Sequence, residues 1–222
     1  MALGRRLLLV LAVLALAGCG GGSKSTETNS ATTTDASGCI PVSQPAAKST
    51  KATKPKQALD PAKTYLVVMH TNCGDFTIKL ATKTSPETTA SFANLAKTGF
   101  FDHTFFHRIV PGFVIQGGDP TGTGSGGPGY STVDKPPAST RYTHGLVAMA
   151  KTGTEPPGTS GSQFFVVTTG DAQLPPDYAV LGTVTKGLDT VNRVGRLGDM
   201  STGGEGVPTE VVEIQKATLV VQ

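Results

Sequence analysis

Hydrophobic and polar positions alternate in short runs along much of the chain. Residues 65–70 are rich in β-forming side chains, and residues 76–80 alternate between apolar and polar positions. Between the two runs, Asn72, Gly74 and Asp75 are residue types typical of a tight turn. We therefore predict that the two runs form a β-hairpin.

A helical period replaces this alternation after residue 83. Thr84 is a candidate N-cap, Pro86 suits the first turn, and Glu87 stands at the capping-box position. Apolar residues then recur at helical spacing as far as Gly99, a residue type that commonly ends helices. The pattern predicts a helix between Thr84 and Gly99.

Short strand-like runs resume after Gly99 and continue to the end of the chain. They cover residues 105–110, 113–116, 145–150, 163–168, 179–184 and 210–221, with a second short helix over 188–194. Strands and helices do not alternate, so a parallel nucleotide-binding sheet is not expected. The pattern predicts a mainly β fold: an eight-stranded closed antiparallel β-barrel capped by two helices.

Composition and charge agree with this fold and exclude one class of partner. The 222 residues include 28 Gly, 15 Pro and no Trp, and only 16% are charged, which argues against a coiled coil or a helix bundle. Residues 1–60 hold seven of the 19 basic residues and three of the 16 acidic ones, which leaves 12 basic and 13 acidic residues in 61–222. Because this part lacks a basic excess, no nucleic-acid partner is expected.

The first residues have the form of a secretory leader. Arg5 and Arg6 precede an apolar run over 7–17 that is too short to span a bilayer as a helix. The run ends in L-A-G-C at 16–19, which resembles a bacterial lipoprotein signal, whose cysteine carries a lipid after cleavage. We expect residues 1–18 to be removed and Cys19 to anchor an exported protein to the outer face of the cell membrane, or to the periplasmic side of an outer membrane. An ordinary signal peptide with a chance cysteine is the alternative.

Residues 19–60 are rich in Ser, Thr, Lys, Ala and Pro and contain almost no large apolar side chain. Such a segment buries too little surface to offset its ordering entropy, so we predict a disordered linker with a root-mean-square reach of roughly 35 Å. The folded domain is expected over 61–222. If Cys19 is lipidated, Cys39 and Cys73 either form a disulfide that pins the linker to the domain or remain free thiols.

Two sequence motifs carry the candidate chemistry. Residues 106–119 read F-H-R-I-V-P-G-F-V-I-Q-G-G-D and residues 161–166 read G-S-Q-F-F-V, with a weaker segment, G-L-V-A-M-A, at 145–150. Their order and spacing resemble the cyclophilin family of peptidyl-prolyl cis-trans isomerases. The resemblance covers residues 64–221 and implies a barrel of eight strands with two helices, in agreement with the strand pattern.

The resemblance implies an active site on an outer face of the barrel and assigns roles by motif position. Arg108 is the expected catalytic arginine, acting with Gln116 and Phe113. The proline pocket is expected from Phe113, Val114, Phe165 and Leu174. The residues expected to orient the peptide or to form the rim are His107, Gln116, Ala150, Lys151, Gln163 and Tyr178. No cofactor and no metal are implied.

These residue types suit the isomerisation of an X–Pro bond, whose barrier of about 18–20 kcal/mol comes from amide resonance. In the twisted transition state the prolyl nitrogen becomes pyramidal and regains a lone pair. The guanidinium of Arg108 can donate to this lone pair only in the twisted state, which requires no proton transfer. A charged hydrogen bond contributes about 1.5–3 kcal/mol, so the pocket must supply further acceleration.

Several positions depart from the family's pattern. Gln173 precedes the pocket leucine where many members have Trp, and the missing indole donor puts strong cyclosporin binding in doubt. Tyr178 replaces a common His, Lys151 replaces the usual Asn, and residues 155–158 lengthen a loop. Arg108 and Gln116 are retained, so the departures concern inhibitor binding and substrate choice.

Three other patterns carry no function. A G-x-G-x-x-G match at 122–127 is followed by Pro128 rather than by a helix, and it predicts only a flexible surface loop. His103 and His107 are spaced i, i+4 in a strand-like region, where this spacing is not a metal-binding face. Ser162, His107 and Asp119 lack the local context of a hydrolase triad.

The sequence thus predicts an exported, lipid-anchored, monomeric prolyl isomerase that assists the folding of proline-containing polypeptides at a membrane surface. A membrane-tethered chaperone or binding module for such segments, with little turnover, is the alternative. A purely structural surface lipoprotein is a third class, which the polar residues of the motifs disfavour.

Overall fold

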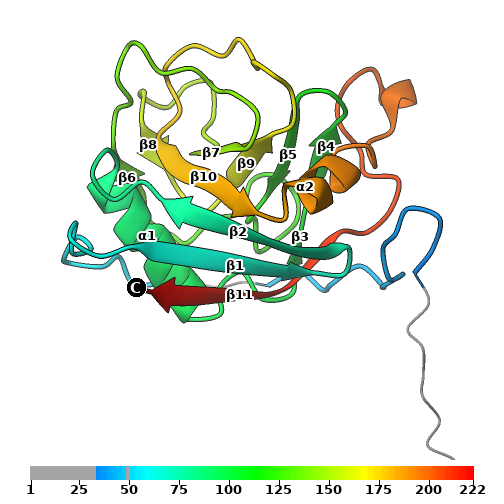
Figure 1. Cartoon of the computed structure of the whole chain (residues 1–222), viewed down its shortest axis with the longest axis horizontal. Helices are drawn as coiled ribbons and strands as arrows, with labels where there is room; N and C mark the ends of the chain where they lie inside the picture. The colour runs from blue at the N-terminus through cyan, green and yellow to red at the C-terminus, as the bar shows by residue number, and fades with distance from the viewer. Residues whose placement is uncertain (1–33, 49–50) are drawn as a thin grey trace, which may run out of the picture. The chain divides into compact units, whose positions relative to one another are not determined.

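The hairpin expected at residues 65–80 is present in the computed structural model, which describes residues 34–48 and 51–222. Strand β1 (Tyr65–Thr71) pairs antiparallel with β2 (Gly74–Leu80) across a tight turn (Figure 1). Gly74 has a φ of 110°, a conformation that favours glycine. The residue types that predicted the turn therefore form it.

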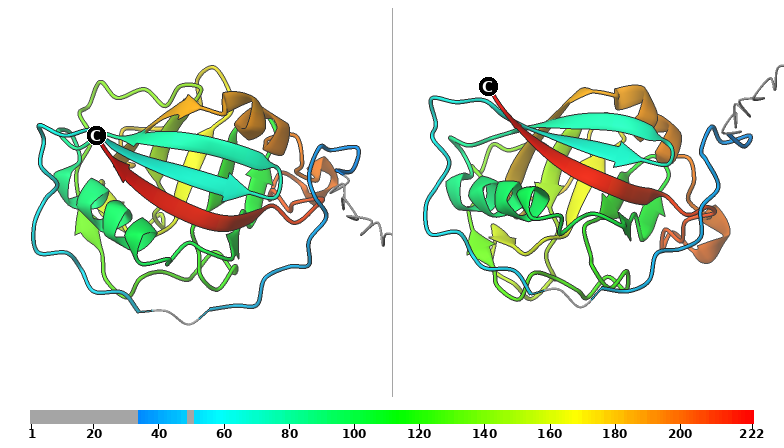
Figure 2. Two further views of the ribbon diagram at one scale, coloured as in Figure 1. Left: turned by 60° about the horizontal axis from the view of Figure 1, so that its bottom comes forward. Right: turned by 90° about the horizontal axis from the view of Figure 1, so that it is seen from below.

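Antiparallel strands make up most of the remaining structure. They are β3 (Thr104–Phe105), β4 (Arg108–Val110), β5 (Val114–Gly117), β6 (Thr132–Val133), β7 (Leu146–Met149), β8 (Thr159–Ser160), β9 (Phe164–Val167), β10 (Val180–Lys186) and β11 (Glu213–Val221). Nine strands form one sheet in the order β3-β11-β1-β2-β10-β7-β9-β5-β4, while β6 pairs separately with β8. Figure 2 shows how strongly the large sheet curls.

The prediction of a closed eight-stranded barrel is wrong, because the sheet is open between β3 and β4. The run at 105–110, expected as one strand, changes partners at residues 106–107: β3 pairs with β11, and β4 pairs with β5. Residues 206–212 span the gap. The carbonyls of Val212 and Gly206 accept from the amides of Phe106 at 2.9 Å and Ile109 at 2.7 Å. Single hydrogen bonds to a loop thus replace a strand ladder, and the sheet is a half-barrel.

Both predicted helices pack against the sheet. Helix α1 (Pro86–Lys97) lies against β11, and α2 (Leu188–Val194) lies against β2 (Figure 1). The predicted cap of α1 is wrong: Ser85, not Thr84, is the N-cap residue, and no side chain caps the helix there. Glu87 contacts Lys54 at 3.3 Å instead of closing a capping box. A short 3₁₀ helix, η1 (Met200–Thr202), follows α2.

Apolar side chains form two clusters on opposite faces of the sheet. The larger includes the rings of Phe92, Phe101 and Phe106, of which Phe92 and Phe106 pack edge-on against Phe164. The smaller, here called the outer cluster, has a buried part formed by Val114, Tyr142, Ala148, Phe165 and Val167. Because successive strand residues point to opposite faces, the neighbours Phe164 and Phe165 belong to different clusters.

Residues 34–48 and 51–60, here called the strap, lie along the surface of the domain (Figure 2). The sequence predicts a disordered linker over 19–60, whereas residues 34–48 and 51–60 are held against the domain. Main-chain amides of Ile40, Lys48 and Ala52 donate to carbonyls of the domain, and a disulfide joins Cys39 to Cys73. These contacts join residues far apart in the sequence, so composition alone does not reveal them. The boundary at residue 61 stays a prediction.

The predicted signal peptide, residues 1–18, and the lipidation site Cys19 lie outside the described residues. Within 34–48 and 51–222, no helix has the length and apolar content needed to cross a membrane. The leader and the lipid anchor stay predictions.

Candidate active site

The cross-strand register places the main candidate residues side by side on the outer face of the sheet. Arg108 of β4 faces Gln116 of β5, and Gln116 in turn faces Phe165 of β9. Ala148 of β7 completes the row opposite Phe165. Directly opposed residues of antiparallel strands point to the same face, so these four side chains share one surface.

The outer cluster adjoins this row. Val114 faces Val167 on the neighbouring strand, and both are buried with Phe165. Phe113 and Leu174 pack at the edge of the cluster, where both are half-buried. The four residues expected to form the proline pocket are therefore brought together in one apolar surface.

Tyr142 is a member of the outer cluster that sequence reasoning missed. Its ring is fully buried and packs edge-on against Tyr178, with ring centres 5.9 Å apart, while Phe165 packs edge-on against Tyr178 at 5.5 Å. The Tyr142 hydroxyl donates to the carbonyl of Tyr178 at 2.7 Å and accepts from its amide at 3.0 Å. Burial raises the pKa of Tyr142 to about 12. Tyr142 lies in a stretch without strand or helix pattern, so no local signal marked it.

Two glutamines form a short relay beside the row. The Nε2 atom of Gln116 donates to Oε1 of Gln163 at 3.1 Å. The Nε2 atom of Gln163 donates to the carbonyls of Gly124 at 2.9 Å and Gly126 at 3.0 Å. Because Gln163 must donate to two carbonyls, its oxygen faces Gln116, and the Oε1 atom of Gln116 is left to accept from a ligand.

The buried carboxylate of Asp119 holds the loop that receives Gln163. It accepts from the amides of Thr121 at 2.7 Å, Gly124 at 2.6 Å and Gly126 at 3.1 Å. Burial raises the pKa of Asp119, but these hydrogen bonds outweigh burial and lower the pKa below its ordinary value. The glycine-rich segment at 122–127, predicted as a flexible surface loop, is thus pinned by one carboxylate.

His107 is enclosed next to Arg108. Among the described residues neither ring nitrogen of His107 has a hydrogen-bond partner. Burial lowers the pKa of His107; the charge of Asp119 opposes the shift, and the charge of Arg108 adds to it. The imidazole is therefore neutral at pH 7 and leaves Arg108 as the cation of this part of the site.

A groove of about 680 Å³ extends from Gln116 along the loop that carries the glycines. Gln163, Ala150 and Lys151 line it together with residues 124–131. The Lys151 ammonium donates to the carbonyl of Glu155 at 3.0 Å and lies 5.6 Å from the centre of the Tyr178 ring. Of the residues expected at the rim, Gln116, Ala150, Lys151 and Gln163 line this groove, whereas His107 and Tyr178 lie outside its lining.

Arg108 has a free guanidinium but a constrained stem. None of the ion pairs in the described part of the chain includes it. The Cγ atom of Arg108 lies against Gly206, where an added Cβ would approach it to 2.9 Å. Gly206 also has a φ of 81°. Sequence reasoning missed Gly206, because its role depends on packing against a strand about a hundred residues earlier.

Comparisons with known proteins agree with this geometry. The family model "Cyclophilin type peptidyl-prolyl cis-trans isomerase/CLD" matches residues 66–219. The chain belongs to the cyclophilin family. It is similar to "Peptidyl-prolyl cis-trans isomerase-like 1" of Gibberella zeae, with 39% identity over 69% of this chain and 94% of the relative. It also resembles "Probable peptidyl-prolyl cis-trans isomerase B" of Mycobacterium leprae, with 38% identity over 78% of this chain and 63% of the relative.

A solved structure supports the same assignment. A cyclophilin type peptidyl-prolyl cis-trans isomerase of Cryptosporidium parvum aligns with a TM-score of 0.63 and 31% identity, over 71% of this chain and 98% of that chain. The protein is thus a cyclophilin-type peptidyl-prolyl cis-trans isomerase. The individual roles assigned to its site residues stay predictions.

Ser162 and His103, to which the sequence analysis assigned no function, make other contacts in this cyclophilin. Ser162 donates to the carbonyl of Gly118 at 2.7 Å, and His103 contacts Glu213 at 2.8 Å. Within the described ranges, no three His, Cys, Asp or Glu residues are grouped to hold a metal ion. The described serine and histidines therefore form no hydrolase triad.

Proposed function

We propose that this isomerase acts on proline-containing segments of exported polypeptides at a membrane surface, to which a lipid on Cys19 anchors it. The leader sequence supports export and lipidation. The disulfide between Cys39 and Cys73 is consistent with an oxidising compartment outside the cytoplasm. Uncatalysed proline isomerisation takes tens of seconds or more, so it delays folding wherever unfolded chains emerge.

In the proposed mechanism, the outer cluster holds the proline ring while the acyl side of the X–Pro bond rotates. Phe113, Val114, Phe165 and Leu174 supply the apolar contacts. The guanidinium of Arg108, which stands beside this cluster, donates to the prolyl nitrogen as the amide twists and the nitrogen regains its lone pair. Planar geometry lets the same guanidinium also contact a carbonyl oxygen.

The two glutamines orient the peptide backbone in this proposal. The relay from the glycine loop through Gln163 presents the Oε1 atom of Gln116 as an acceptor for a substrate amide. The groove beside Ala150 and Lys151 takes the adjoining residues of the peptide. The solved Cryptosporidium parvum structure described as being in the presence of the dipeptide Ala-Pro, 31% identical, supports a proline peptide as ligand here.

The observation that carries the mechanism is the register that places Arg108 beside Gln116 and Phe165. Its test is magnetisation-transfer NMR on an X–Pro peptide with the full chain and with Arg108→Ala. Arg196→Ala, which replaces an exposed arginine two residues after the end of α2, is the matched control. We expect fast exchange with the wild type and the control and at least tenfold slower exchange with Arg108→Ala. A folded Arg108→Ala variant with wild-type exchange would contradict the mechanism.

The same measurement separates an enzyme from a tethered binder. Chemical-shift changes in the peptide without faster exchange would favour a binding module for proline-containing segments. Membrane anchoring is tested independently by fractionating a bacterial host that expresses the wild type or Cys19→Ala. Recovery of the wild type with membranes and release of the variant support the anchor, whereas equal partitioning contradicts it.

A further inference from the structure

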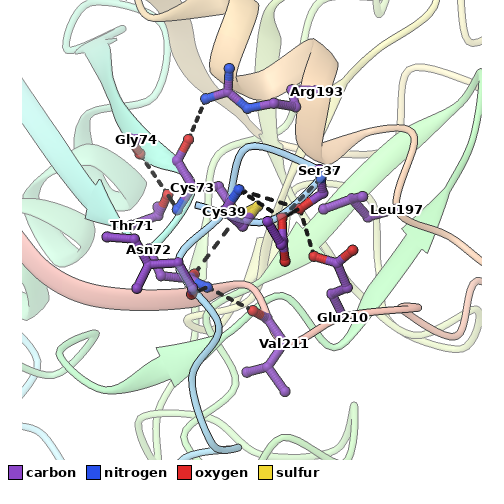
Figure 3. Close-up of a disulfide and its surroundings, with 12 residues drawn as sticks. Ser37, Cys39, Thr71, Asn72, Cys73, Gly74, Arg193, Leu197, Glu210 and Val211 are labelled. Carbon is purple, nitrogen blue, oxygen red and sulfur yellow. Dashed lines mark hydrogen bonds between the residues drawn. A yellow bond between two sulfur atoms is a disulfide. The ribbon is translucent and has the colours of Figure 1, made fainter. Parts of the chain in front are cut away.

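The strap is tied to the domain at one point by a disulfide and a buried asparagine (Figure 3). Cys39 and Cys73 are each only 1% exposed and belong to the larger apolar cluster. Next to them, the amide of Ile40 donates to the Asn72 carbonyl at 2.8 Å, and Nδ2 of Asn72 donates to the Ile40 carbonyl at 2.8 Å. These bonds hold residues 37–40 of the strap in one position.

The same asparagine reaches the segment that spans the open edge of the sheet. Its Nδ2 atom also donates to the Val211 carbonyl at 2.9 Å, and its Oδ1 atom accepts from the Glu213 amide at 2.8 Å. The Ser37 hydroxyl of the strap lies between the Asp35 carboxylate and the Glu210 carboxylate, whose oxygen is 2.7 Å away. Residues 210–213 are therefore held on one side by the strap and Asn72.

The other side of this segment supports Arg108. The Gly206 carbonyl accepts from the amide of Ile109 at 2.7 Å, and the stem of Arg108 lies so close to Gly206 that an added Cβ would approach its Cγ atom to 2.9 Å. Since no strand ladder closes the sheet here, residues 206–212 are the direct support of this edge of the half-barrel. A shift of these residues would move the strand that carries Arg108.

A second part of the strap contacts the back of the groove wall. The amide of Ala52 donates to the Pro128 carbonyl at 3.0 Å, and the ammonium of Lys54 donates to the Ser131 carbonyl at 3.2 Å. Residues 124–131 of this wall line the groove.

We propose that the strap is a positioning element of the active site. Its disulfide-bonded part braces residues 210–213, the end of the segment that begins at Gly206 behind Arg108, and its second part braces the wall of the groove. The disulfide-bonded part affects the isomerisation rate of the bound peptide, because it acts on the position of Arg108. The second part affects the affinity for the peptide, because it acts on the wall of the groove. This inference rests on the role proposed above for Arg108.

The first test measures kcat and KM for an X–Pro peptide with the full chain and with the Cys39→Ser/Cys73→Ser double variant. We expect kcat to fall by roughly tenfold and KM to change little, since a small displacement of a catalytic group is costly. Ser37→Ala keeps the disulfide and removes the contact with Glu210, so it tests the same brace without the risk of unfolding. We expect it to lower kcat by about threefold.

The second test uses Lys54→Met, with Lys56→Met as its matched control. Lys56 lies exposed on the same strap, and among the described residues it makes no ion pair or side-chain hydrogen bond, whereas the Lys54 ammonium contacts Ser131 of the groove wall. We expect Lys54→Met to raise KM severalfold at nearly constant kcat, and Lys56→Met to behave as the wild type. All assays are run well below the melting temperature of every variant, so lower stability alone would leave both constants unchanged.

Two results would overturn the proposal. One is a set of folded variants in which neither the disulfide pair nor Ser37→Ala lowers kcat. The other is an equal effect of Lys54→Met and Lys56→Met on KM. Arg108→Ala in the same assay separates the two hypotheses: if it retains full kcat, the role of Arg108 fails, whereas if it loses kcat and the strap variants do not, only the bracing fails.

Discussion

The Oε1 atom of Gln163 accepts a hydrogen bond from the Nε2 atom of Gln116 at 3.1 Å. The two residues lie 47 positions apart, and the bond determines which end of the Gln116 amide is available to a ligand. A loop fastened by the Asp119 carboxylate determines in turn how Gln163 is oriented. The orientations of the two glutamines are thus determined by hydrogen bonds to the loop beside them.

Replacement of Gln163 tests this relay. Gln163→Leu removes the acceptor for Gln116 and the donor to the glycine loop, so Gln116 can rotate freely. We expect kcat/KM for an X–Pro peptide to fall by roughly tenfold with little change in thermal stability. Gln215→Leu, an exposed glutamine on β11, is the matched control. Wild-type kcat/KM in folded Gln163→Leu would contradict the relay.

Replacement of Gly206 tests the support of Arg108. In Gly206→Ala the new Cβ would approach Cγ of Arg108 to 2.9 Å and Cγ2 of Val110 to 2.7 Å. We expect kcat to fall by roughly tenfold, because the arginine is displaced. Gly203→Ala is a close control, since Gly203 also has a positive φ of 69° but has nothing within 4 Å of its added Cβ.

Both alanine variants carry backbone strain of about 1–2 kcal/mol, so both should be less stable in denaturant unfolding. Only Gly206→Ala should lose turnover. Equal turnover in the two variants would show that Gly206 matters for backbone conformation alone.

The hydroxyl of Tyr142 is expected to hold one wall of the proline pocket. Tyr142→Phe keeps the ring but removes both hydrogen bonds to the main chain of Tyr178. We expect the free energy of unfolding to fall by about 1–3 kcal/mol and KM for the peptide to rise. Tyr65→Phe removes a hydroxyl that accepts from the Asp60 amide, outside the predicted site, and should leave KM unchanged. An unchanged KM in Tyr142→Phe would exclude this role.

Stability should depend on pH through His107. Burial lowers the pKa of His107 in the folded state, so the folded protein favours the neutral ring. The contribution of His107 to the free energy of unfolding is complete above the unfolded-state pKa of about 6.5. It declines as the pH falls from there toward the folded-state pKa, by at most about 1.4 kcal/mol per pH unit. Urea unfolding between neutral and mildly acidic pH should show this decline in the wild type and a smaller one in His107→Gln. Identical pH dependence in the two proteins would contradict the prediction.

The hairpin formed by β4 and β5 shows why part of the site was predictable. Arg108, Phe113 and Gln116 lie within nine residues of sequence, so one turn sets the register that brings Arg108 opposite Gln116. The strand pattern likewise located β1, β2, β9, β10 and both helices to within a few residues. Local geometry controls each of these features, and local geometry can be inferred from neighbouring residues.

Other features depend on contacts that no local pattern encodes. The predicted closed barrel required β3 to meet β4, but whether two sheet edges meet depends on the curl of the whole sheet and on residues 206–212 between them. The strap looked like linker because it buries few apolar groups. Its main-chain hydrogen bonds and its disulfide hold it to the domain instead.

Sequence pattern and motifs alone predicted most of the strands, the two helices, the family and a set of candidate site residues. Each of these follows from spacing within short segments or from contiguous motifs. The folded chain alone reveals that the sheet stays open, that Tyr142 packs in the outer cluster, that Gly206 lies against Arg108, and that the strap is bonded to the domain. These features arise from packing and hydrogen bonds between segments distant in sequence, whose partners are chosen only when the whole chain has folded.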